Sequence, residues 1–135
     1  MTNFRLPLLI AALAISAAPV SAQAGPRDDI LAGYAAEAGV KSFDPAAGKA
    51  FFLATHSGGK PDTPSCSTCH TSNPLASGKT RAGKSIDPMA VSANPGRFTD
   101  KSKVEKWFGR NCNSVLGRDC TASEKGNFIA WLSSL

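Results

Sequence analysis

The sequence is poor in residues that bind metals. Its 135 residues include two histidines, four cysteines and two methionines, one of which is Met1. No strand-like alternation of apolar and polar residues precedes the first two cysteines, and this argues against the βαβ setting of a thioredoxin-like dithiol. No run after residue 24 is apolar enough to cross a bilayer, which takes about 20 residues. Basic repeats and stacking motifs are also missing, and their absence argues against a nucleic-acid partner.

Residues 1–24 are typical of a secretory signal peptide. Arg5 supplies the positive start, residues 6–18 form the apolar stretch, and residues 22–24 read A-Q-A, a small-residue cleavage site. We therefore expect export to the periplasm, cleavage of the signal, and a mature domain of residues 25–135. A chain of that length forms one small domain with a limited core.

The most informative motif is C-S-T-C-H at residues 66–70. C-x-x-C-H is the attachment signature of a c-type haem. Cys66 and Cys69 would form thioethers with the porphyrin, and His70 would bind the iron from one face. We therefore expect one covalently attached haem c, with its sixth iron position still to be assigned.

A zinc site is the alternative use of a C-x-x-C pair. Such a site needs two further ligands at suitable spacing. The remaining cysteines, Cys112 and Cys120, have no histidine beside them. The motif therefore favours haem over zinc.

Four segments predict helices, and irregular chain connects them. The segments are residues 28–38 before the C-cap Gly39, residues 45–56 after the N-cap Asp44, residues 101–110 after the N-cap Asp100, and a last helix that begins at the capping box Thr121-x-x-Glu124. Residues 57–65 predict a loop leading into the haem motif. Residues 71–97 keep neither helical nor strand period and predict a wrap around the porphyrin. We expect an all-α fold without significant sheet.

Cys112 and Cys120 are not needed by the haem, and two such cysteines in an exported protein should pair. Their bridge would close a nine-residue loop directly after the helix at residues 101–110. In the chain-entropy model such a loop is worth roughly 2.5 kcal/mol. The bridge either staples a small domain or positions a neighbouring residue.

Two sets of residues resemble known cytochromes. Gly48 and Phe52 before the haem motif, with Trp131 on the last helix, resemble class I cytochrome c, in which the terminal helices cross at small residues beside an aromatic pair. The closer resemblance, to the sphaeroides haem protein family of oxygen-binding class I cytochromes c, is carried by residues 58–66, 97–100, 104–107 and 109–115. It implies an all-α fold wrapped around one covalent haem and a disulfide between the two remaining cysteines. It also implies that Asn111, directly before the first bridge cysteine, is a sixth ligand that leaves the iron on reduction.

Three other residues compete for the sixth position. Met89, the only methionine after the signal, is the conventional candidate, because thioether ligation raises the potential of electron carriers. His56 is expected at the surface, at the end of the helix before the motif. Asn113 is a weaker substitute for Asn111, since a turn role suits it better. The amide oxygen of Asn111 is a neutral, weak donor that favours ferric iron, and its NH₂ could donate to an incoming ligand.

Basic residues gather around the motif, since residues 60–119 contain ten Lys/Arg and five Asp/Glu. A basic rim would attract an acidic redox partner, such as another cytochrome. An ordinary solvated surface explains the excess equally well. Arg81, Lys84, Arg97 and Arg110 are candidate partners of the haem propionates.

We expect a periplasmic c-type cytochrome that transfers electrons and, when ferrous, binds oxygen, nitric oxide or carbon monoxide at a site vacated by Asn111. An ordinary electron carrier with His70 and Met89 as ligands is the first alternative. An enzyme that reduces oxygen, peroxide or nitric oxide ranks below both, because the sequence shows no distal histidine and acid pair.

Overall fold

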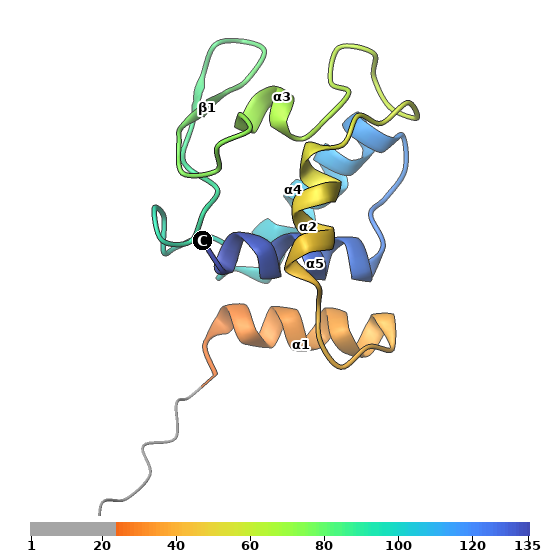
Figure 1. Cartoon of the computed structure of the whole chain (residues 1–135), viewed down its shortest axis with the longest axis vertical. Coiled ribbons are helices and arrows are strands. Elements are labelled where there is room, and N and C mark those ends of the chain that lie inside the picture. The colour runs from red at the N-terminus through yellow and green to blue at the C-terminus, as the bar shows by residue number, and fades with distance from the viewer. Residues whose placement is uncertain (1–23) are drawn as a thin grey trace, which may run out of the picture.

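The computed structural model describes residues 24–135, so all but the last residue of the predicted signal peptide lies outside the described residues. Five helices and one short β-ladder occur in this range (Figure 1). They are α1 (Pro26–Ala38), α2 (Pro45–Leu53), α3 (Ser67–His70), β1 (Gly78–Lys79), β2 (Ser85–Ile86), α4 (Lys101–Leu116) and α5 (Ala122–Ser133). The expected all-α class is confirmed, because the two antiparallel strands have two residues each. Within this range no helix is both long enough and apolar enough to span a membrane.

Most helix ends follow the local signals in the sequence. The Asp44 side chain accepts a hydrogen bond from the Ala46 N–H at 2.8 Å, and Thr121 and Glu124 form the expected capping box. Gly39 ends α1 in the left-handed conformation, with φ of 68°. These contacts confirm the predicted starts of α2 and α5 and the predicted end of α1.

Three predicted helix boundaries were wrong. α1 begins at Pro26 rather than Asp28. α2 ends at Leu53 rather than His56, because the chain turns back and the His56 N–H donates to the Pro64 carbonyl at 2.7 Å. α4 continues past Arg110 to Leu116, where Gly117 ends it with φ of 69°. Asn111 and Cys112, the first cysteine of the bridge, therefore both lie within α4.

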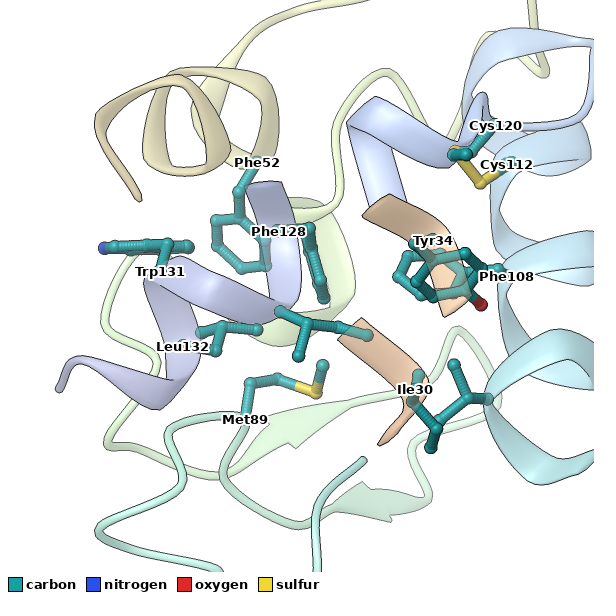
Figure 2. Packing of buried hydrophobic residues seen from close by; sticks show 13 residues of the cluster. Ile30, Tyr34, Phe52, Met89, Phe108, Cys112, Cys120, Phe128, Trp131 and Leu132 are labelled. Atoms are coloured by element: carbon teal, nitrogen blue, oxygen red, sulfur yellow. A yellow bond between two sulfur atoms is a disulfide. The ribbon is translucent and has the colours of Figure 1, made fainter. Parts of the chain in front are cut away.

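The crossing of α2 and α5 forms the centre of the fold. A Cβ added to Gly48 would lie 2.0 Å from the Asn127 carbonyl oxygen, so only glycine permits this approach. Beside the crossing, the fully buried Phe52 ring packs against Trp131 and Phe128, with centroid distances of 5.1 and 5.8 Å. Figure 2 shows the three rings together. The predicted crossing at a glycine with an adjacent aromatic pair is confirmed.

α1 packs along α5 and is joined to distant segments (Figure 1). The Arg27 guanidinium donates to the carbonyls of Pro95 and Arg97, with distances of 2.8 to 3.1 Å. The buried Tyr34 hydroxyl donates to Glu105 on α4 at 2.6 Å. α1 thereby ties the loop before α4, and α4 itself, to the core.

Candidate haem-binding site

A cavity of about 810 Å³ opens between the C-x-x-C-H segment, the irregular chain after it, and α4. Its lining includes Cys66, Cys69, His70, Met89 and Asn111. The structure therefore brings the expected attachment residues and two of the candidate sixth ligands to one cavity. A volume of this size lies in the range of cofactor pockets, about 300 to 1,000 Å³.

The two thiols of the motif are free and partly buried beside the cavity. α3 makes a single helical turn, and Gly78 of β1 packs against it so closely that a Cβ would lie 2.1 Å from the Cys69 carbonyl oxygen. Burial raises the pKa of the Cys66 thiol to about 11. A neutral thiol is not activated for disulfide exchange, which agrees with a role other than a redox dithiol.

His70 is a neutral imidazole. Burial, and then the nearby charge of Arg97, lower the pKa of its ring to about 4. Its Nδ1 is buried and finds no hydrogen-bond partner among residues 24–135. A neutral ring with a partnerless buried nitrogen suits metal ligation, in which one imidazole nitrogen binds the metal.

The donor set fits a haem better than a bare metal ion. Nowhere in the described part of the chain do three or more His, Cys, Asp or Glu side chains gather as a metal cluster. The cavity instead combines two free thiols, one imidazole and apolar walls that include Phe98, Phe108 and Val115. These features fit a haem c attached through Cys66 and Cys69, and they argue against the zinc alternative.

Asn111 and Met89 line the cavity in different ways. Lys103, Trp107 and Asn111 stand at positions i, i+4 and i+8 of α4 and all three line the cavity with exposed side chains. Met89 is only 7% exposed and belongs to the core cluster, which also contains Leu132 (Figure 2). Asn111 is thus available to an occupant of the cavity, whereas Met89 already packs in the core.

The other candidate ligands are occupied elsewhere. The ring of His56 lies beside Phe51, with centroids 5.3 Å apart, and its Nε2 is 3.1 Å from the Phe51 carbonyl oxygen. The Asn113 amide donates to the Gly109 carbonyl at 2.8 Å and to Asp119 at 2.7 Å. Neither residue belongs to the cavity lining.

The predicted disulfide is present between Cys112 and Cys120, whose Cα atoms are 5.6 Å apart. It joins the last turns of α4 to the start of α5, because Cys120 directly precedes the N-cap Thr121. Both cysteines line the cavity wall.

The mouth of the cavity is basic. Arg81, Lys84, Arg97 and Lys103 line it, against the acidic residues Asp87 and Asp100. Arg97 donates to the carbonyls of Pro88 and Asp87, at 2.9 and 2.5 Å. Arg110 instead lies over the Trp107 ring, 5.6 Å from its centroid. Three of the four candidate propionate partners therefore stand at the cavity.

Thr63 and Ser114 also line the cavity. Both lie in segments that carry the family resemblance, but the sequence predicted no role for either residue. Their hydroxyl oxygens lie 2.9 Å apart, although the residues are 51 positions apart in the chain. A threonine in a turn-rich loop and a serine near a helix end carry no local signal, since each has an ordinary capping or turn role.

Known proteins are similar to this chain over most of its length. Residues 38–132 match a domain family described as "Domain of unknown function (DUF1924)". The chain is 53% identical to cytochrome c-type protein SHP of Cereibacter sphaeroides over 121 residues, which cover 90% of this chain and 93% of SHP. The solved structure of oxidized SHP, described as an oxygen-binding cytochrome c, superposes with a TM-score of 0.78 at 55% identity, covering 81% of this chain and 96% of SHP. The solution structure of cytochrome c'' from Methylophilus methylotrophus, which was studied for haem-ligand detachment, gives a TM-score of 0.64 at 38% identity, covering 78% and 90%.

Proposed function

The chain belongs to the SHP family of c-type cytochromes, and from this premise we propose that it transfers electrons in the periplasm and, when ferrous, binds small diatomic molecules at a position that Asn111 vacates. The cofactor of this family is covalently bound haem c. Its iron supplies a one-electron redox couple and a coordination position. The residues of the cavity would attach the haem and supply the protein ligands of its iron.

Cys66 and Cys69 would hold the haem through thioether bonds, and His70 would ligate its iron. The low pKa of the buried imidazole keeps its lone pair free at neutral pH. Residues 25–135 are the haem domain, and residues 1–24 are the signal that directs it to the periplasm.

The observation that carries the proposal is the exposed side chain of Asn111 on the wall of the cavity that His70 also lines. An amide oxygen is a neutral, hard donor, so the Asn111 side chain would ligate ferric iron and would bind the iron more weakly after reduction. Its NH₂ group could then donate a hydrogen bond to a diatomic ligand. The relatives support a haem site that binds gas and releases a ligand, because SHP is described as oxygen-binding and cytochrome c'' as a protein of haem-ligand detachment.

Replacing Asn111 with alanine tests the ligand assignment. Ferric Asn111→Ala should show an altered Soret spectrum and should bind added azide faster than the wild type, because no protein ligand has to leave. Asn113→Ala is the matched control, since its amide bonds within α4 and to Asp119 and lies away from the cavity. Identical ferric spectra for wild type and Asn111→Ala would exclude Asn111 as a ligand.

An electron carrier with His70 and Met89 as ligands is the second candidate, because Met89 also lines the cavity. Ferric methionine ligation gives a weak charge-transfer band in the red. Its presence in the wild type and its loss in Met89→Leu would favour this candidate over Asn111.

The basic cavity mouth favours a redox partner with an acidic docking face. Lys103 lines the cavity, while Lys106 and Arg110 flank the exposed Trp107 on α4. Long-range attraction would raise the association rate, and added salt would lower it. Reduction by an acidic cytochrome should therefore slow steeply with ionic strength, whereas reduction by a neutral small molecule should not.

A further inference from the structure

The loop at residues 57–65 caps the helix that carries Asn111. α4 ends at Leu116, so the Ser114 carbonyl has no helical N–H four residues later. It accepts instead from the Lys60 N–H at 2.7 Å and from the Thr63 hydroxyl at 3.1 Å. The loop that precedes the haem attachment segment thus satisfies a carbonyl at the end of α4.

The two hydroxyls of this contact satisfy each other. Thr63 is buried, with a side chain at 6% exposure. When its proton goes to the Ser114 carbonyl, the Ser114 hydroxyl can donate across the 2.9 Å to Thr63 Oγ1. Removing the Thr63 hydroxyl takes away this partner of the half-buried Ser114 hydroxyl, and removing the Ser114 hydroxyl leaves Thr63 Oγ1 with the Ser114 carbonyl alone.

Close backbone packing surrounds the hydroxyl pair. A Cβ on Gly58 would lie 2.2 Å from the Leu116 carbonyl oxygen, and one on Gly59 would lie 2.2 Å from that of Ser114. A Cβ on Gly117 would lie 2.1 Å from the Gly58 carbonyl oxygen. The loop and the helix end therefore meet backbone to backbone, with no flexible side chain between them.

The contact links the segment before the haem attachment motif to the helix that carries Asn111. Thr63 stands three residues before Cys66, and Ser114 stands three residues, about one helical turn, after Asn111. Both hydroxyl residues line the cavity. The last turns of α4 are thus hydrogen-bonded to the segment that leads into the thioether attachment.

We propose that Thr63 and Ser114 are positioning residues that hold the last turns of α4 fixed while the Asn111 side chain leaves and returns. This inference rests on the proposed function, since it requires Asn111 to be the ferric ligand. A fixed helix confines the redox-linked movement to one side chain, so that Asn111 returns to the same place. Without the hydroxyl pair the turn can shift, and Asn111 leaves more often.

The test is the rate at which imidazole binds the ferric protein at saturating imidazole, where departure of Asn111 limits the reaction. A hydrogen bond contributes enough to change an equilibrium about three- to tenfold, and Thr63→Val should raise the limiting rate by a factor in that range. Thr63→Ser retains the hydroxyl and should restore the wild-type rate. Carbon monoxide binding to the ferrous protein should be unchanged, because Asn111 has already withdrawn.

Ser134→Ala is the matched control, because the Ser134 hydroxyl donates to the Trp131 carbonyl at the end of α5, at 2.7 Å, and neither residue lines the cavity. Equal limiting rates for wild type and Thr63→Val, or an equal rise in Ser134→Ala, would overturn the positioning role. Ser114→Ala removes only one hydroxyl and should shift the rate in the same direction, which keeps the test decisive should Thr63→Val fail to fold. If Asn111→Ala binds imidazole no faster than the wild type, the proposed ligand fails, independently of the positioning pair.

Discussion

Removal of the disulfide should cost stability while leaving the ferric ligand in place. The bridge joins Cys112 and Cys120, eight positions apart, and closes a loop of nine residues. The chain-entropy model gives about 2.5 kcal/mol for a loop of this length. Both side chains are buried, so truncation to alanine adds some lost packing. Cys112→Ala/Cys120→Ala should therefore lose at least about 2.5 kcal/mol in its free energy of unfolding.

The ferric spectrum of this double variant should stay close to that of the wild type. Asn111 is ordered by α4, and the helix end is still held by Gly117 and by the loop at residues 57–65. The assay is chemical denaturation followed by far-UV circular dichroism, together with the Soret spectrum of the folded ferric protein. A loss below about 1 kcal/mol would refute the stability argument, which expects more. A fully changed ferric spectrum would show that the bridge, rather than the helix, positions Asn111.

Three further predictions test the core, the proposed ligand and an ion pair. Gly48→Ala should destabilise the protein by about 1 to 3 kcal/mol through overpacking at the α2–α5 crossing, and a stability equal to wild type in urea denaturation would contradict the close approach. Met89→Leu, a volume-conserving change in the core, should cost less than about 1.5 kcal/mol and leave the ferric spectrum intact, so a changed spectrum would count against Asn111. Burial opposes ionisation of Glu105, but hydrogen bonds from Lys125 and Tyr34 outweigh it and lower the pKa of this carboxyl below its usual 4.5. The ionised Glu105 therefore stabilises the fold above pH 4.5, and this stabilisation is lost as the pH falls through the lowered pKa. Glu105→Gln should make the free energy of unfolding fall less steeply with decreasing pH in the acid range. An equally steep fall in wild type and variant would refute this.

Local signals predicted the starts of α2, α4 and α5 well. The capping hydrogen bonds of Asp44 in α2, and of Thr121 and Glu124 in α5, join residues at most three positions apart. They could therefore be predicted from the sequence. Gly48 and Phe52 could be placed on one face by helical spacing, and the resemblance to class I cytochromes supplied the partner helix.

The full length of α4 could not be predicted in this way. Gly109, Asn111, Asn113 and Ser114 are weak helix formers, and their sequence favours an early end. The helix continues because distant groups satisfy it: the loop at residues 57–65 donates to the Ser114 carbonyl. A cap supplied from 51 residues away leaves no local pattern.

The polar contacts around the core escaped prediction for the same reason. Tyr34 donates to Glu105, which also accepts from Lys125 at 2.8 Å, and these residues come from three helices. Each of them has an ordinary position in its own helix. Only the packing of α1, α4 and α5 reveals the group.

The central claim is that reduction frees an iron position that Asn111 holds in the ferric protein. It is tested most directly by adding carbon monoxide to the dithionite-reduced protein and recording the Soret band, with the ferric protein as the reference. If reduction frees the position, the ferrous Soret band should shift strongly and the ferric band should not shift. An unshifted ferrous band would show that a protein ligand still occupies the position, and would contradict the release of Asn111.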